Sequence, residues 1–251
     1  MTGSGGATRG ALLRRLLSGG PRLTVGMLTA DLLHLADELA ELRTAGVELV
    51  HVDVMDGVFC PALTVGPPVI KALGPDLIRD AHLMIQDPLS KLDQFVAAGA
   101  DMVTFHLEGA PQPYRVLQVL GQATNANDPD RGVIRGVGIN PGTPLSAVEP
   151  LLDDLDYLLI LAISPGWGGQ AFLPSTAGRL EAARRMIERS GRPILLGVDG
   201  GITRDNLAHV ATLGADLIVS GSAIFDGTAG AAGRAASMVD AVRSPARVLA
   251  S

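Results

Sequence analysis

The sequence predicts a (β/α)8 barrel of the TIM type, and three observations support this fold class. Eight apolar, strand-like runs alternate with stretches of helical periodicity from Leu23 onward. Aromatic residues are only 3% of the 251 residues, so Ala, Val, Leu and Ile must build the core, which suits buried parallel strands and their covering helices. Glycine-rich segments follow the last three runs, where barrels place phosphate sites.

A doubly wound open sheet is the alternative architecture. It is disfavoured because no G-x-G-x-x-G motif opens the first helix and because the glycine-rich segments come late in the chain. Parallel strands need crossover helices, and closing the sheet leaves no exposed edge. The barrel therefore explains the pattern better.

The expected elements follow one another as strand and helix. Strands are expected at 23–28, 47–54, 77–85, 101–107, 133–139, 155–163, 193–198 and 216–220. Helical periodicity covers 31–46, 88–100, 175–191 and 203–215, and several of these stretches start at Ser, Thr or Asp and stop at Gly. Residues 123–132 are expected to form a surface loop before the fifth strand and not a domain linker.

Residues 1–20 are rich in Gly and Arg and contain no acidic residue. Arg14 and Arg15 interrupt the one apolar run of this segment, which argues against a secretory signal. We therefore expect a disordered or loosely helical extension, with an organelle-targeting peptide as the alternative. A single barrel domain is expected over residues 21–251.

Composition limits the partners. The formal net charge is −6 and the charges are scattered, so neither nucleic acid nor an anionic membrane is an expected partner. No apolar stretch approaches the ~20 residues needed to cross a bilayer. Cys60 is the single cysteine and cannot form an internal disulfide, which favours a reducing compartment, and we expect a cytoplasmic protein with a small-molecule partner.

Polar residues interrupt the second strand in the segment HVDVMDG. Alternate side chains of a strand share a face, so His51, Asp53 and Met55 point the same way, toward the barrel mouth. The third strand shows the same pattern with His82 and Met84, and Asp199 lies at the end of the seventh strand. Two histidines and two carboxylates suit one divalent ion such as Zn²⁺, Fe²⁺, Mn²⁺ or Co²⁺.

The other residues of the site have a structural alternative. Met55 and Met84 are either a polarizable wall of the site or core filler. His34, His106 and His209 are expected to be hydrogen-bonded core or rim residues.

The late segments SPGWGGQ, DGG and SGSAIF predict a phosphate site, because glycine lets backbone N–H groups approach an anion. Its expected residues are Gly166, Trp167, Gly168, Gly169, Gly200, Gly201, Gly221 and Ser222.

From about Leu23 to Phe225 the chain resembles the ribulose-phosphate 3-epimerase family. The resemblance is carried, in order, by LTAD, HVDVMDG, HLMIQDP, TFHLE, GIN with PGTP, PGWGGQAF, VDGGI and GADLIVSGSAIF. It implies a ribulose-phosphate-binding barrel that interconverts D-ribulose 5-phosphate and D-xylulose 5-phosphate, a phosphorylated ketose substrate and the pentose phosphate pathway. We also expect a homo-oligomer.

The resemblance further implies that His51, Asp53, His82 and Asp199 bind the metal. It implies that Asp53 and Asp199 also serve as acid and base. Inverting the carbon beside a ketone removes a proton from one face and returns one to the other, through an enediolate, and two carboxylates can share this work. No redox cofactor is required.

The chain departs from the family pattern near the sugar. Gly26 stands where the family usually has serine, and Val58 and Ala62 stand where it usually has His and Asn. Leu161 replaces a third methionine of the family's site. Ser164 stands where Glu, Asp or Asn is frequent. These changes leave a related substrate open, such as a hexulose 6-phosphate. Gly26 and Leu161 also motivate a noncatalytic phosphosugar-binding protein as an alternative. The orotidine-phosphate decarboxylase and hexulose-phosphate synthase group is disfavoured. Its signature is D-x-K-x-x-D, whereas in this chain Asp53 is followed by VMD, without the lysine.

Overall fold

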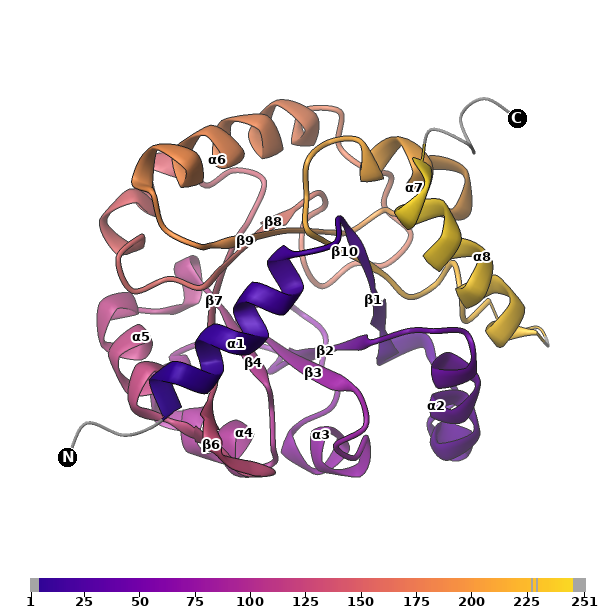
Figure 1. The fold of residues 1–251 in the computed structure, drawn as a ribbon, viewed down its shortest axis with the longest axis horizontal. Coiled ribbons are helices and arrows are strands. Elements are labelled where there is room, and N and C mark those ends of the chain that lie inside the picture. The colour runs from indigo at the N-terminus through magenta and orange to yellow at the C-terminus, as the bar shows by residue number, and fades with distance from the viewer. Residues whose placement is uncertain (1–4, 227, 229, 246–251) are drawn as a thin grey trace.

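The computed structural model describes residues 5–226, 228 and 230–245. It contains a closed barrel of parallel strands in the order β1-β10-β9-β8-β7-β4-β3-β2, surrounded by helices (Figure 1). The (β/α)8 fold class expected from the sequence is confirmed. Each of the eight expected strands is present within a few residues of its expected bounds.

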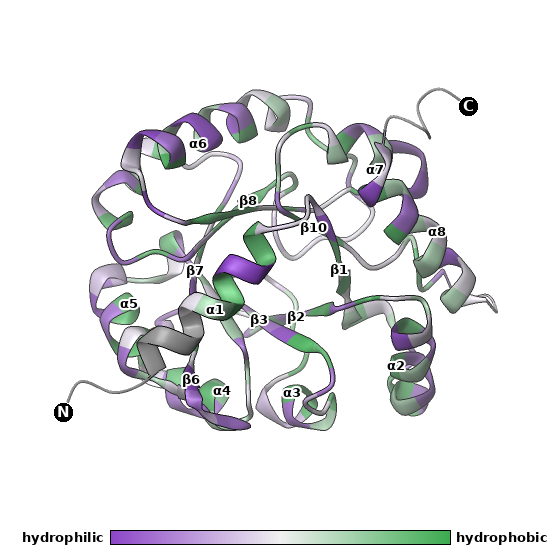
Figure 2. Cartoon of the chain, in the orientation of Figure 1, coloured by the Kyte–Doolittle hydropathy of each residue, from purple (hydrophilic) through white to green (hydrophobic). Residues whose placement is uncertain are grey.

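The barrel strands are short and almost wholly buried. They are β1 (Arg22–Gly26), β2 (Leu49–Met55), β3 (Ile78–Met84), β4 (Met102–His106), β7 (Ile134–Ile139), β8 (Tyr157–Leu161), β9 (Leu195–Asp199) and β10 (Leu217–Ser220). The outward side chains, such as Val50, Val52 and Val54 of β2, pack beneath the helices in one large apolar cluster. Figure 2 shows the hydrophobic residues along the strands and many hydrophilic residues on the outer helices.

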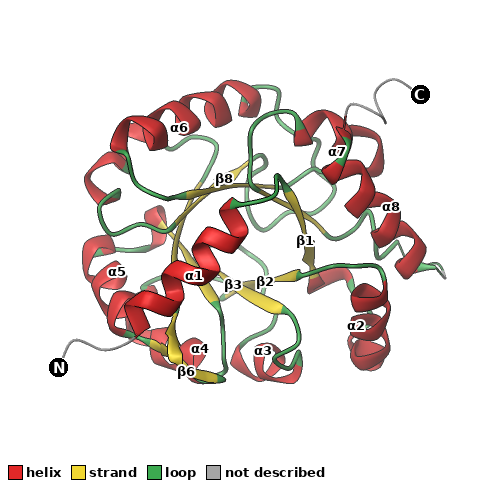
Figure 3. Cartoon of the chain, in the orientation of Figure 1, coloured by secondary structure: helices red, strands yellow, loops and turns green. Residues whose placement is uncertain are grey.

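The covering helices are α2 (Leu35–Thr44), α3 (Pro67–Ala72), α4 (Leu92–Ala97), α5 (Pro113–Gln122), α6 (Thr176–Ser190), α7 (Arg204–Ala211) and α8 (Ala231–Arg243) (Figure 3). Two of the capping signals in the sequence form the expected caps. Thr203 and Asn206 form a capping box at the start of α7, and Gly191 ends α6 with φ of 65°. Between β7 and β8 the chain makes the short 3-10 turns Leu145–Ala147 and Glu149–Leu151.

The amino-terminal segment is helical, which is one of the two expected forms, but it packs against the barrel and is not a loose extension. Residues Gly5–Leu17 form helix α1, which lies across the barrel end (Figure 1). Its Leu12, Leu13 and Leu16 are buried, and they join the apolar cluster inside the barrel that includes Leu49, Ile78, Met102, Ile134, Leu195 and Leu217. The helix forms because this tertiary contact buries its leucines, which the periodicity of the segment alone does not reveal. Residues 1–4 of the expected extension and 246–251 of the expected domain lie outside the described residues.

Residues 123–132 also differ from the expected surface loop. They form an antiparallel hairpin of β5 (Thr124–Asn125) and β6 (Asp128–Gly132). Buried Asp101 anchors this hairpin, because it accepts hydrogen bonds from Asn125 Nδ2 at 3.1 Å and from Arg131. Asp101 also accepts from Arg79 Nε at 3.1 Å.

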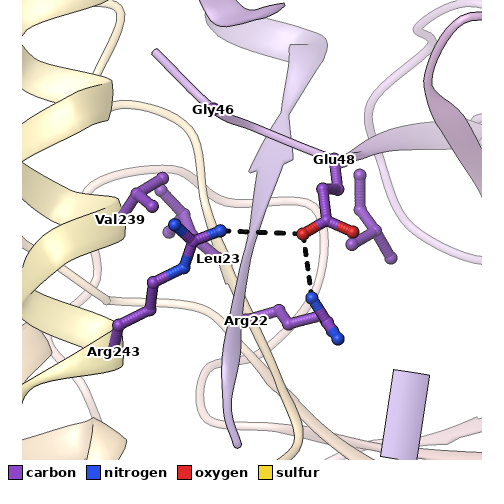
Figure 4. A pocket seen from close by; sticks show the side chains of 7 residues that line it. Arg22, Leu23, Gly46, Glu48, Val239 and Arg243 are labelled. Carbon is purple, nitrogen blue, oxygen red and sulfur yellow. Dashed lines mark hydrogen bonds and ion pairs between the residues drawn. The ribbon is translucent and has the colours of Figure 1, made fainter. Parts of the chain in front are cut away.

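Charged side chains surround this amino-terminal end of the barrel as well. Glu48 accepts from Arg22 Nη1 at 2.8 Å and lies 3.6 Å from Arg243 Nη2 (Figure 4). Arg22 Nη2 in turn donates to the carbonyl oxygens of Arg15 and Ser18, at the end of α1. These contacts hold α1 to β1.

No helix within the described part of the chain is long and apolar enough to cross a membrane.

Candidate active site

The carboxyl ends of the strands form a polar mouth at the end of the barrel opposite α1. Along β2 the inward positions are Leu49, His51 and Asp53, so the barrel interior changes from apolar to polar toward the mouth. The parallel register places Asp53 beside His82 of β3 and His51 beside Asp80. Asp199 ends β9, three strands away from β2 around the barrel by way of β1 and β10.

Four side chains meet at this mouth. His51, Asp53, His82 and Asp199 each offer one ligand atom, and these atoms lie within 4.8 Å of one another. Asp53 Oδ1 is 2.9 Å from His82 Nδ1 and 3.2 Å from His51 Nε2. Asp199 Oδ2 is more distant, at 3.8 Å from His51 Nε2 and 3.9 Å from His82 Nδ1.

Burial and chemistry both suit a metal ion here. The two histidine side chains are 0% exposed and the two carboxylates 17%, so the histidines form the floor and the carboxylates face the opening. Two imidazoles and two carboxylates are a common set for divalent transition metals. The residues present therefore fit such an ion.

The carboxylates and imidazoles of the cluster shift one another's pKa values. Burial and the negative charge of Asp53 raise the pKa of Asp199 to about 7. Although burial opposes it, the charge and hydrogen-bonding contact of His51, followed by the contact with His82, hold the pKa of Asp53 well below its usual value. Burial and the neighbouring imidazoles lower the pKa of His82 to about 4, so this ring is neutral at pH 7 and has a lone pair for a metal.

Behind the cluster lies a set of polar residues that the sequence analysis did not assign to the site. Asp80 Oδ2 is 2.9 Å from His51 Nδ1, and Asp80 Oδ1 accepts from Thr104 Oγ1 at 2.8 Å. His106 Nε2 is 2.8 Å from His82 Nε2. The expectation of a hydrogen-bonded core histidine is confirmed for His106, but its partner is a residue of the cluster.

Two adjoining pockets open beside Asp53 and Asp199. One, of about 390 Å³, is lined by the tips of the last three strands, including Gly168, Gly169, Gly200, Gly201, Gly221 and Ser222. No lysine or arginine is among its lining residues. The donors available there to an anion are therefore backbone N–H groups and neutral side chains such as Thr203 and Ser222.

The second pocket, of about 310 Å³, is mainly apolar. Met55, Met84, Leu161, Gly166 and Trp167 line it together with Asp53 and Asp199. The structure thus brings all the expected site residues to one mouth, with the two methionines on the wall. It adds lining residues that the sequence analysis missed, among them Leu28, Ile163, Gln170 and Thr203, whose positions depend on how the loops fold over the strands.

Three of the departures from the family pattern line these pockets. Gly26 borders the glycine-lined pocket, and Ala62 and Leu161 border the apolar one. Val58 lines neither and is 73% exposed. The three lining positions are the ones able to alter substrate preference directly.

Known proteins are similar to this chain over most of its length. A sequence profile described as the ribulose-phosphate 3 epimerase family matches residues 22–225. Ribulose-phosphate 3-epimerase of Escherichia coli strain K12 is 40% identical over 203 residues, covering 80% of this chain and 87% of that protein. The Bacillus subtilis strain 168 protein of the same name is 36% identical over 207 residues, covering 81% and 92%.

Solved structures support the fold. KGPDC from Streptococcus mutans superposes with a TM-score of 0.65 at 16% identity, covering 89% of this chain and 97% of that one. The 3-hexulose-6-phosphate synthase of Salmonella typhimurium gives a TM-score of 0.60 at 19% identity, covering 88% and 98%. At these identities the likeness concerns the barrel alone.

Proposed function

The chain belongs to the ribulose-phosphate 3-epimerase family and is an isomerase acting on carbohydrates; we propose that it interconverts D-ribulose 5-phosphate and D-xylulose 5-phosphate with a divalent metal ion. The observation that carries the proposal is the cluster of His51, Asp53, His82 and Asp199, whose ligand atoms lie within 4.8 Å beside a glycine-lined pocket. We further propose that it acts in the pentose phosphate pathway in the cytoplasm, as a homo-oligomer.

The proposed ligands are His51 Nε2, His82 Nδ1 and one oxygen each of Asp53 and Asp199. Zn²⁺, Fe²⁺, Mn²⁺ and Co²⁺ all accept this mixture of nitrogen and oxygen donors. When bound, the ion supplies Lewis acidity that stabilises the negative charge developing on the substrate oxygens.

Asp53 and Asp199 are proposed to move the proton at C3. They approach the mouth from strands β2 and β9, so a substrate carbon between them presents one face to each. One carboxylate removes the C3 proton and the enediolate forms; the other carboxyl group then protonates the opposite face, which inverts the carbon. In the reverse direction the two exchange roles.

The phosphate is proposed to bind at Gly168, Gly169, Gly200, Gly201, Gly221 and Ser222, with Gly166 and Trp167 closing the neighbouring wall and Met55 and Met84 lining its apolar side. Gly201 has φ of +66°, and a Cβ there would lie 2.5 Å from Phe172 N. This close backbone approach requires glycine. The absence of a side chain at glycine likewise suits donation from backbone N–H groups to an anion.

Asp53→Asn and Asp199→Asn test the mechanism. Each change keeps the side-chain size but removes a proton carrier, and the rate of epimerisation should fall ~10² to 10⁴-fold. Exchange of the C3 proton with deuterated solvent separates the two roles, because the remaining carboxylate still works on its own face. We expect exchange without inversion with one epimer in one variant, and with the opposite epimer in the other.

Asp93→Asn is the matched control, because this carboxylate lies exposed on α4 and should leave the rate unchanged. The metal content of each variant is measured alongside. Near wild-type epimerisation by both active-site variants, at unchanged metal content, would refute the two-carboxylate mechanism. A metal-loaded wild-type protein that binds but does not turn over D-ribulose 5-phosphate would instead support a noncatalytic phosphosugar-binding protein.

A related ketose phosphate is the second candidate substrate, favoured by Gly26, Ala62 and Leu161 in the pocket walls. Comparing kcat/KM for D-ribulose 5-phosphate with that for a hexulose 6-phosphate decides between them. A larger value for the hexulose would transfer the assignment to it.

A further inference from the structure

Both histidines of the metal cluster have a hydrogen-bonding partner on the ring nitrogen that faces away from it. His51 turns Nε2 to the cluster and its Nδ1 lies 2.9 Å from Asp80 Oδ2. His82 does the opposite: Nδ1 faces the cluster and Nε2 lies 2.8 Å from His106 Nε2. The two proposed ligands therefore use different ring nitrogens.

The contact at His82 continues to a carboxylate. His106 Nδ1 is 3.1 Å from Glu108 Oε2. The other oxygen of Glu108 accepts hydrogen bonds from the backbone N–H of Asn140, at 2.7 Å, and from the Thr143 hydroxyl. Although burial opposes it, the hydrogen bond from His106, followed by those from Thr143 and Asn140, lowers the pKa of Glu108 to about 2, so it is an acceptor at neutral pH.

The order of these groups fixes where the protons lie. An ionised carboxylate only accepts, so His106 must carry its proton on Nδ1, and a neutral ring then has a lone pair on Nε2. That lone pair accepts from His82 Nε2–H. His82 is consequently left with an unprotonated Nδ1, directed at the cluster.

The opposite placement of the protons on His106 and His82 is unfavourable. A proton on His106 Nε2 alone would leave its Nδ1 lone pair facing the Glu108 carboxylate. It would also leave His82 Nε2 as the acceptor, with a proton on the Nδ1 that faces Asp53. Such a ring cannot bind a metal through Nδ1.

We infer that Glu108, acting through His106, is a positioning residue that selects the metal-binding tautomer of His82, as Asp80 does directly for His51. This inference rests on the metal site of the proposed function. It gives His106 and Glu108 a role in metal affinity although neither touches the metal or the substrate.

The surroundings hold this chain of hydrogen bonds in place. Arg179 of α6 donates to the carbonyl oxygens of Thr143, at 2.8 Å, and Asn140, at 3.1 Å, so the loop that binds Glu108 is held from its other side. A Cβ at position 138 would lie 3.1 Å from His106 Nε2, so Gly138 leaves room for the imidazole. His106 itself is completely buried.

The variants His106→Phe and Glu108→Gln test the inference. His106→Phe keeps a ring against Phe59, whose centroid is 4.9 Å away, but removes the acceptor for His82. In Glu108→Gln the amide oxygen accepts from Asn140 N–H, so the NH2 group faces His106 Nδ1 and donates to it. The direction of the hydrogen bonds from residue 108 through His106 to His82 is then reversed. Tyr157→Phe is the control, because this buried hydroxyl in the barrel interior has no hydrogen-bond partner among the residues that the structure describes.

The measurement is the affinity of the metal-free full-length protein for Zn²⁺ and Co²⁺, by competition with a chromophoric chelator and without substrate. Loss of such an outer hydrogen bond typically costs 10 to 100-fold in metal affinity, and we expect about this loss in both variants and none in Tyr157→Phe. Circular dichroism establishes that each variant is folded. Wild-type affinity in both folded variants would overturn the inference, as would the absence of metal binding by the wild-type protein.

Histidine tautomers in the wild-type protein, read from long-range ¹H–¹⁵N NMR correlations, give a test that needs no variant. We expect His82 protonated on Nε2 and His106 on Nδ1, and the opposite pair would overturn the inference. Neither measurement involves turnover. Tight metal binding with the expected tautomers but no epimerase activity would therefore refute the proposed function and leave the positioning role intact.

Discussion

Replacing Leu16 with alanine should destabilise the protein although Leu16 lies outside the strands and helices of the barrel repeat. Leu16 is 0% exposed, and its side chain belongs to the apolar cluster inside the barrel. A buried Leu→Ala change costs about 2–5 kcal/mol, depending on how far the site collapses. Because α1 lies across the end of the barrel and can shift toward it, we expect about 3 kcal/mol.

The expected loss is large enough to measure by calorimetry or urea unfolding. For a chain of this size each kcal/mol lowers Tm by roughly 2–4 °C, so the melting point should fall by about 6–12 °C. Metal content must be kept equal between samples, because bound metal itself stabilises the folded state. Turnover at 25 °C should be retained, since the cluster of His51 and Asp199 lies at the other end of the barrel.

Arg15→Ala is the matched control, because Arg15 is exposed on the same helical turn. Its effect should be within about 0.5 kcal/mol. A disordered extension would make both variants equal to wild type. That result would refute the packing of α1 against the barrel.

Three further predictions concern the site. Gly201→Val should abolish inhibition by inorganic phosphate while metal content stays unchanged, because a Cβ there meets Phe172 N at 2.5 Å; retained inhibition would place the phosphate elsewhere. Removing the metal with a chelator should abolish epimerisation and lower Tm, and adding back Zn²⁺, Fe²⁺, Mn²⁺ or Co²⁺ should restore both; full activity in protein shown by elemental analysis to be metal-free would contradict the proposal. The pKa of Glu108 is lowered from 4.5 to about 2 in the folded protein, so its contribution to stability is complete above about pH 4.5 and is lost as the pH falls toward 2. The stability of wild type should accordingly decline more steeply in this window than that of Glu108→Gln, and parallel pH profiles would argue against it.

The strands and the metal cluster could be predicted because both depend on short-range pattern. Alternation places His51 and Asp53 on one face of β2, and polar residues within apolar strands mark a position where burial needs compensation. Asp80 obeys the same alternation relative to His82, whereas Glu108 follows β4 in the 3-10 turn Leu107–Gly109. The strand register alone brings Asp80 to His51 and Thr104, and the loop after β7 brings Asn140 and Thr143 to Glu108.

The packing of helix α1 on the barrel could not be predicted, for a different reason. Its segment contains several glycines and is too short to be stable alone, so the leucine pattern supports a helix only if something covers it. The open amino-terminal end of the barrel provides that cover. The hairpin of β5 and β6 is similar, because its anchor Asp101 lies more than twenty residues away in sequence.

The apolar and polar halves of the barrel interior depend on each other. Asp80, His51 and His106 are buried polar groups, and burying such groups is unfavourable unless each is hydrogen-bonded. Helix α1 covers the apolar end with Leu12, Leu13 and Leu16, and so separates this end of the interior from bulk water. Hydrogen bonds in such a low-dielectric interior are stronger and better defined than at the surface. The helix at one end of the barrel thereby favours the fixed imidazole orientations on which metal binding at the other end depends.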